Sequence, residues 1–131
     1  MTHPRAVVSL YDEPMWKSIE AGGWELQQCD DCGTHRYPPA PICHKCLSMS
    51  YTWKKLSGRG KILSWVIFHR QYLDDYKPPY NVVAVQLAEG PIVISNLVGA
   101  KPEGSWVGHD VAVCYERSAE GHTLPRVKLT A

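Results

Sequence analysis

The stretch CDDCG at Cys29–Gly33, followed by CHKC at Cys43–Cys46, decides the fold of this chain. A Cys-x-x-Cys turn places two thiolates on the same side of a tight loop, and two such turns supply the four sulfurs of a closed tetrahedral site. Gly33 follows the second sulfur and suits the positive φ that such a turn often needs. The pattern therefore predicts a structural zinc site with the ligands Cys29, Cys32, Cys43 and Cys46.

Other interpretations of the same cysteines are two disulfides or four free buried thiols. The N-terminus has no basic-then-apolar signal pattern, so we expect a soluble, cytoplasmic protein, and disulfides are rare in that compartment. Iron is the alternative metal, because a four-sulfur tetrahedron also holds it. His35 and His44 have ligand chemistry, but four cysteines already fill a tetrahedron, and we expect both histidines to be bystanders.

The length of the chain and its net charge argue against a large multidomain protein, a membrane-spanning protein and a protein that binds phosphate backbones. A chain of 131 residues forms one compact domain or two very small ones, and no stretch approaches the length of a membrane span. The formal net charge is +1, and four thiolates with one Zn²⁺ bring the loaded protein to about −1. This balance is unlike that of proteins that bind phosphate backbones. The fifth cysteine, Cys114, lies in an apolar run, where we expect a buried strand residue and not a nucleophile.

A short helix is expected before the cysteines. Asp12 fits the N-cap, Pro14 fits the first turn and Gly22 fits the end of a helix within residues 12–23. A helix this short is not stable alone, so its apolar face must pack on the domain behind it or on a partner chain. That face carries, at i, i+3 and i+4 spacing, Met15, Trp16 and Ile19.

Alternating apolar and polar residues predict strands over the rest of the chain. Around the cysteine pairs they lie at 24–28, 34–37 and 50–56. Beyond residue 57 five more are expected, at 61–72, 80–88, 92–98, 110–117 and 124–129. In the first of these five, one face should hold Leu63, Trp65 and Ile67, and the other face Ile62, Val66 and Phe68.

The five later strands, the first of them long and preceded by Gly58-Arg59-Gly60, indicate a five-stranded barrel of the OB-fold type. A five-stranded SH3-like barrel is the alternative. The chain is thus expected to be mainly β and to divide into an N-terminal extension and helix (1–23), a zinc ribbon (24–56) and an OB-fold (57–131).

The order of these features resembles a family of bacterial and archaeal zinc-ribbon plus OB-fold proteins that accompany thiolases and other acyl-CoA enzymes. The resemblance covers roughly residues 10 to 129. The matching stretches are the helix around Trp16, Leu26–Gly33, Arg36–Pro39, Cys43–Cys46, Ser57–Ile62, His69-Arg70, Pro78–Tyr80, Gly90-Pro91, Asn96–Gly99, and Gly121 with Leu124-Pro125.

What the resemblance implies is a rubredoxin-like zinc ribbon joined to an OB-fold, acting as a non-catalytic accessory subunit. The implied partner is a thiolase-like enzyme, a hydratase or an aldolase of acyl-CoA metabolism, and the implied roles are contributing to the CoA site or bridging subunits. One departure is Ala40, where many relatives carry an arginine. If that arginine meets CoA phosphates, this chain binds CoA less well or uses another residue. Single-stranded nucleic-acid binding by the OB-fold and electron transfer through iron are the alternative functions.

No motif of a catalytic site is present: the sequence has no nucleophile elbow, no P-loop and no Gly-x-Gly-x-x-Gly. Cations and tyrosines around the first long strand are the better candidates, because OB-folds bind ligands through such loops. In an acyl-CoA protein they could hold phosphates and stack an adenine. The alternative is that they are ordinary solvated residues. The predicted ligand-binding residues are Arg59, Lys61, Arg70, Tyr72, Lys77 and Tyr80.

Overall fold

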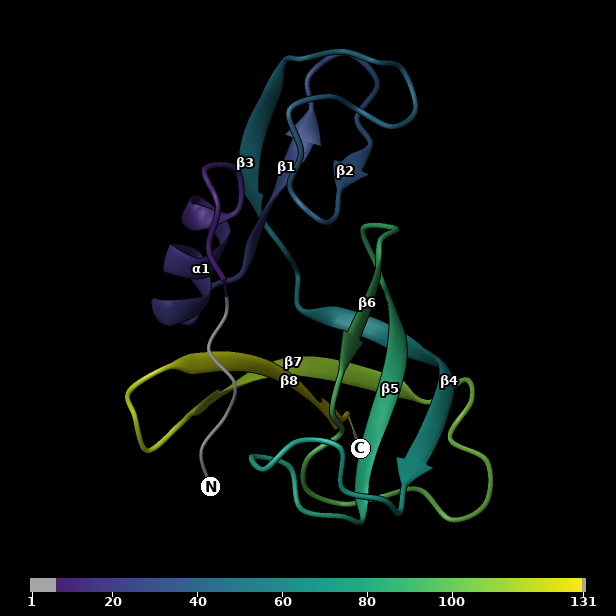
Figure 1. Cartoon of the computed structure of the whole chain (residues 1–131). Coiled ribbons are helices and arrows are strands. Elements are labelled where there is room, and N and C mark those ends of the chain that lie inside the picture. The colour runs from purple at the N-terminus through teal and green to yellow at the C-terminus, as the bar shows by residue number, and fades with distance from the viewer. Residues whose placement is uncertain (1–6, 131) are drawn as a thin grey trace.

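The computed structural model describes residues 7–130, so the first six residues of the predicted N-terminal extension and Ala131 lie outside it. The chain is mainly β, as expected, with a small sheet above a larger curved sheet and one helix beside them (Figure 1). In chain order the elements are α1 (Glu13–Glu20), β1 (Glu25–Cys29), β2 (His35–Arg36), β3 (Tyr51–Lys55), β4 (Arg59–Phe68), β5 (Tyr80–Leu87), β6 (Ile92–Ser95), β7 (Asp110–Arg117) and β8 (Thr123–Leu129).

The small sheet is an antiparallel ribbon in the order β2-β1-β3. Gln27 in its central strand lies opposite Arg36 on one side and Trp53 on the other. The strand predicted over 34–37 covers only His35–Arg36, and it cannot continue through Pro38 and Pro39 because these have no N–H to donate to a ladder. The two loops that this ribbon holds together are the ones that carry the cysteines.

The predicted helix is confirmed as α1, and Gly22 follows its end with a φ of 79°. Asp12 occupies the N-cap position but does not cap the helix with its side chain. Its carboxylate instead accepts hydrogen bonds from the backbone N–H and the hydroxyl of Ser9. Met15 and Ile19 are buried, and α1 packs against both β1 and β8, so the helix lies between the ribbon and the larger sheet.

The larger sheet is antiparallel in the order β6-β5-β4-β7-β8. Its two edges meet, because Leu97 forms a parallel bridge with Val127. The backbone N–H of Val98 donates to the Val127 carbonyl at 2.9 Å, and the N–H of Val127 donates to the Asn96 carbonyl at 3.2 Å. This closure produces the five-stranded OB-fold barrel that the sequence predicted.

The predicted faces of the first barrel strand are right for Trp65, Val66 and Ile67 relative to one another, but wrong in placing Leu63 with Trp65 and Ile62 with Val66. The register of β4 against β5 shifts between Ile62 and Ser64, so Leu63 is the extra residue of a β-bulge. Because one extra residue reverses the alternation, Trp65 and Ile67 face the core with Ile62. Leu63 and Val66 face solvent. The strand also ends at Phe68, four residues earlier than expected.

One continuous apolar core joins the helix, the ribbon and the barrel. Ile19 from α1 and Leu26 from β1 are fully buried in the same cluster as barrel residues such as Val83. A hydrogen bond of 2.8 Å from the backbone N–H of Trp24 to the Tyr115 hydroxyl adds a polar link between ribbon and barrel. The shared core fixes the metal-site end of the molecule against the barrel. Within residues 7–130 no helix is long and apolar enough to cross a membrane.

Candidate functional site

The four predicted ligands come together at the end of the ribbon. The four Sγ atoms all lie within 4.8 Å of one another. The Sγ atoms of Cys29 and Cys46 are 3.5 Å apart, and those of Cys32 and Cys43 are 3.6 Å apart. These separations are those of sulfurs that share one ion, and four sulfurs are the donor set that zinc prefers in structural sites. The cluster therefore fits one tetrahedral metal ion.

The two cysteine turns have the same backbone design. The N–H of Gly33 donates to the Cys29 carbonyl at 2.9 Å, and the N–H of Leu47 donates to the Cys43 carbonyl at 3.0 Å. Both residues have positive φ, 78° at Gly33 and 65° at Leu47. A leucine reaches this conformation only at a steric cost, so the second turn is held by its surroundings. The Cys-x-x-Cys spacing predicted both turns. Only the first has the expected glycine, Gly33, and the second has Leu47 at the equivalent position.

Arg36 supplies part of those surroundings. It is 1% exposed, and its guanidinium donates to the backbone carbonyls of Ala40 at 3.3 Å, Ser48 at 2.9 Å and Ser50 at 3.2 Å. It also lies over the ring of Tyr51, 5.0 Å from the centroid. One side chain thus ties β2 to both sides of the second cysteine turn. Sequence reasoning gave Arg36 no role, because nothing in the local pattern shows that its carbonyl partners converge.

The ionisation of the thiols indicates a site built for a cation. The backbone N–H of Cys32 lowers the pKa of Cys29 to about 6, and the backbone N–H of Cys46 lowers the pKa of Cys43. For Cys46 the backbone N–H of Ser48 lowers the pKa, but burial and the three neighbouring thiols outweigh it and raise the pKa to about 12. Four thiolates at this spacing repel one another, and a divalent cation relieves that repulsion.

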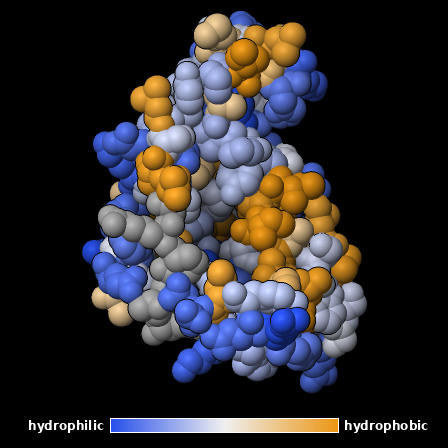
Figure 2. Space-filling model, in the orientation of Figure 1, coloured by the Kyte–Doolittle hydropathy of each residue, from blue (hydrophilic) through white to orange (hydrophobic). Residues whose placement is uncertain are grey.

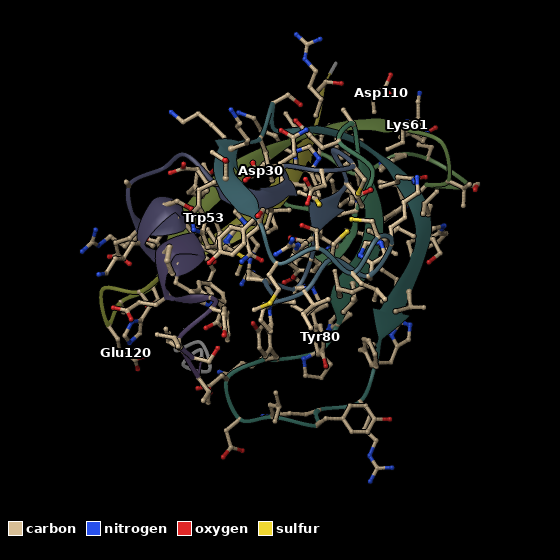
Figure 3. The ribbon with its side chains drawn as sticks, turned by 90° about the horizontal axis from the view of Figure 1, so that it is seen from above. Asp30, Trp53, Lys61, Tyr80, Asp110 and Glu120 are labelled. Carbon is tan, nitrogen blue, oxygen red and sulfur yellow. The ribbon has the colours of Figure 1, made fainter. Side chains whose placement is uncertain are left out.

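The predicted ligand-binding residues do not form one site. Arg59 and Lys61 lie at the start of β4, where the Lys61 ammonium is 2.8 Å from the Asp110 carboxylate. Tyr80 pairs with Phe68 at the far end of this ten-residue strand, and roughly 30 Å of extended chain separates that end from Arg59. Figure 3 shows Lys61 with Asp110 at one edge of the molecule and Tyr80 toward the opposite edge. The other three predicted residues are near Tyr80, in the loop between β4 and β5: Arg70, Tyr72 and Lys77.

Both groups border hollows in the surface. Arg59 lines one of about 520 Å³ with Asp110 and the residues that follow Asp110 in β7. Tyr80 lines another of about 350 Å³, together with Phe68, Ile94 and Arg126. Arg126 is a residue that sequence reasoning missed. It stands on β8 between Pro125 and Val127, and no motif or charge cluster marks it.

Comparison with known proteins gives two family models that match this chain. The zinc ribbon model is described as "ChsH2, rubredoxin-like zinc ribbon domain" and matches residues 16–51, which include all four cysteines. The second is described as "ChsH2, C-terminal OB-fold domain" and matches residues 53–116. The two matches follow one another along the chain in the order of the ribbon and the barrel.

Similar proteins come from bacteria and archaea. The "Probable enoyl-CoA hydratase alpha subunit" of Thermomonospora curvata is 32% identical over 122 residues, which cover 93% of this chain. This chain spans only 38% of that protein's length. A "DUF35 domain-containing scaffold protein" of Methanocaldococcus jannaschii is 32% identical over 95 residues, 71% of this chain and 67% of the relative.

Among solved structures, a chain described as "Ltp2-ChsH2(DUF35) aldolase" superposes with a TM-score of 0.87 at 26% sequence identity. The match covers 97% of this chain and 100% of that chain. The similarity therefore extends over the helix, the ribbon and the barrel together, in the same relative placement.

Proposed function

The chain belongs to the ChsH2 family of zinc-ribbon and OB-fold proteins, also described as DUF35 scaffold proteins, and from this premise we propose that it is a non-catalytic accessory subunit of an acyl-CoA enzyme. Its partner is a hydratase, an aldolase or a thiolase-like enzyme. The observation that carries this proposal is the superposition over the whole of a ChsH2 chain that is described as part of an aldolase.

We further propose that Cys29, Cys32, Cys43 and Cys46 bind one structural Zn²⁺. The four clustered sulfurs and the match to a zinc ribbon domain support this assignment. When bound, zinc crosslinks the two cysteine turns. Four protein ligands leave no coordination position for water or substrate, and hydrolytic zinc chemistry needs such a position. The metal then holds the shape of a docking surface and takes no part in a reaction.

The surface of the barrel also supports contact with another protein. Leu63, Val66, Ile92 and Ile94 are between 40% and 65% exposed on β4 and β6. Figure 2 shows apolar side chains gathered over this part of the barrel. A groove for single-stranded nucleic acid needs cations and stacking rings along the backbone path. An apolar outer face suits a protein partner better, which makes the nucleic-acid alternative the weaker one.

Co-purification tests the proposed function. The tagged chain is expressed in the organism that encodes it, captured with and without nuclease treatment, and its companions are identified by mass spectrometry. We expect a stoichiometric acyl-CoA enzyme subunit that survives nuclease and is absent from the same tag on an unrelated protein. Recovery of nucleic acid alone would contradict the proposal. Metal analysis of the same preparation separates zinc from the iron of an electron-transfer protein.

A further inference from the structure

The pocket between the β4–β5 loop and the outer face of the barrel shares Ile94 with the apolar face on β4 and β6, but the scaffold function needs no ligand in it. We propose that it binds a small ligand that combines a flat ring with an anionic group. Its walls come from the end of β4, the loop at 69–79, and strands β5, β6 and β8. The proposal goes beyond the accessory role, because it assigns this chain a small-molecule site of its own.

The anion contact is Arg126. This residue lines the pocket and is only 7% exposed. Its Nη1 atom donates to the Pro125 carbonyl at 3.3 Å, and no carboxylate of residues 7–130 lies within ion-pair distance of its guanidinium. A buried cation without a counter-ion is costly. A guanidinium has five N–H donors in a fork that matches a carboxylate or a phosphate, so a bound anion would satisfy both its charge and its hydrogen bonds.

Arg36 makes the comparison clear, because it is the other buried arginine of the described chain. Its two terminal nitrogens donate hydrogen bonds to three backbone carbonyls, and its guanidinium lies over the ring of Tyr51. Those contacts pair both terminal nitrogens of Arg36 inside the protein, and only its buried Nε has no partner. Arg126 makes one long hydrogen bond to a neighbouring carbonyl and borders a hollow. Its other guanidinium nitrogens are not among the buried atoms without a partner, so they remain accessible at the hollow, where a ligand would find free donors.

The ring contact is a group of three aromatic side chains that line the same pocket. The rings of Phe68 and Tyr80 stack with centroids 5.1 Å apart and planes 15° from parallel, and the ring of Tyr76 lies 5.4 Å from that of Tyr80. Val82 and Ile94 add apolar side chains to the lining. Flat rings pack well against such a stack, and ring-to-ring contacts tolerate different ring chemistries.

The walls of the pocket are fixed by hydrogen bonds that cross between strands. The side chain of Asn81 donates to the Leu97 carbonyl at 2.9 Å and accepts from the Leu97 N–H at 2.7 Å. The hydroxyl of Ser95 donates to the Pro125 carbonyl at 3.0 Å, which ties β6 to β8 beside Arg126. OB-folds bind their ligands on the second and third strands and on the loop after the first, which here are β5, β6 and the loop at 69–79.

The size of the pocket limits the ligand. A volume of about 350 Å³ is at the lower end of the range of roughly 300 to 1,000 Å³ that small-molecule sites span. A mononucleotide or a bicyclic aromatic carboxylate is of suitable size, and each presents a flat ring together with an anion. The two share the chemistry that the pocket recognises, and separate probes distinguish them.

Calorimetric titration of the zinc-loaded full chain tests the site, with AMP and 2-naphthoate as the two probes. We expect one saturable site per chain for at least one probe. Adenosine and 2-naphthol, which lack the strong anion, should bind more weakly, and Arg126→Met should weaken binding by at least about tenfold. The matched control is Arg117→Met, an exposed arginine at the end of β7 that does not line this pocket, which should leave the affinity unchanged.

Arg126→Met removes a buried side chain, so a second substitution at an exposed position tests the same site without disturbing the fold. Ile94 is 65% exposed, so Ile94→Trp should fold normally while its larger side chain fills the pocket and blocks both probes. The inference is overturned if neither probe binds, or if Ile94→Trp or a folded Arg126→Met binds as the wild type does. Co-purification of a partner enzyme uses no small ligand. Failure of the probes with a partner still captured therefore removes only this inference, not the accessory function.

Discussion

Single side chains determine whether the ribbon keeps its shape, and Arg36 is the clearest case. Its guanidinium is buried because three backbone carbonyls and the face of Tyr51 replace the water that it loses. Those carbonyls lie around the second cysteine turn, where Leu47 holds a positive φ. The arginine therefore stabilises the strained turn that presents Cys43 and Cys46 to the metal.

Replacing Arg36 by methionine should destabilise the zinc-loaded protein by about 2 to 4 kcal/mol, because three partly buried carbonyl groups lose a charged donor. Urea unfolding of the loaded protein measures the loss. The exposed Arg59→Met provides a matched control and should change the free energy of unfolding by less than about 0.5 kcal/mol. Equal effects of the two substitutions would show that the hydrogen bonds of Arg36 contribute nothing to stability.

Cys114 should react slowly with alkylating reagents. Burial raises the pKa of its thiol, because removal from water disfavours the thiolate. A raised pKa means a smaller thiolate fraction at neutral pH, so the labelling rate should be below that of free cysteine at pH 7 and rise as the pH increases. Mass spectrometry of zinc-loaded protein treated with iodoacetamide follows this rate. Labelling as fast as free cysteine at pH 7 would contradict the assignment of Cys114 as a structural residue.

Among the elements, β4 shows how a local irregularity sets the geometry of the barrel. It pairs with β5 along its length and with β7 only over its first residues, and the bulge at Leu63 divides these two parts. Gly60 lies in the first part, where the backbone of β5 comes very close. A Cβ atom at this position would lie 2.7 Å from Val85 Cγ1 and 2.8 Å from the Gln86 carbonyl oxygen.

Gly60→Ala should therefore destabilise the protein by about 1 to 3 kcal/mol, since the strands must move apart to admit a methyl group. Gly23→Ala is the matched control, because its added Cβ would meet only the tip of the Lys55 side chain, which can swing away. Thermal unfolding of both variants compares the two positions. A melting temperature for Gly60→Ala equal to that of Gly23→Ala would show that the close strand approach is not required.

The sequence predicts the elements well and their details less well. Cysteine spacing, the Pro38-Pro39 pair and apolar alternation locate the helix, the ribbon and all five barrel strands, because each signal is local. No local sequence pattern marks the bulge at Leu63, since it arises where β4 separates from β7 while it continues to pair with β5. The same limit applies to the ligand candidates. Arg126 enters its pocket through contacts between β8 and distant strands, and no neighbour in sequence indicates it.

At the scale of the whole molecule, the metal site and the barrel share a single core. Trp24 and Leu26 lead into the first cysteine turn, and both belong to the cluster that fills the barrel and covers α1. The Trp24 N–H also donates to the Tyr115 hydroxyl on β7. Loss of the metal should therefore affect the barrel as well as the ribbon, because the ribbon strands carry part of the common core.

Cys43→Ser, or removal of the metal by a chelator, should unfold the ribbon and lower the melting temperature, since metal binding supplies folding free energy in so small a unit. Elemental analysis should show zinc lost from the variant, and near-ultraviolet circular dichroism should show altered tryptophan packing. Cys114→Ser is the control and should keep one zinc per chain. Full zinc occupancy with an unchanged melting temperature in Cys43→Ser would contradict the ligand assignment.

The scaffold role is tested most directly by the mass of the zinc-loaded chain mixed with the acyl-CoA enzyme that co-purifies with it, measured by light scattering during gel filtration. The predicted result is one species of defined stoichiometry that contains both proteins. Turnover of the acyl-CoA substrate should require the partner, and the chain alone should show none. Two separate masses, or turnover by this chain without a partner, would contradict its assignment as an accessory subunit.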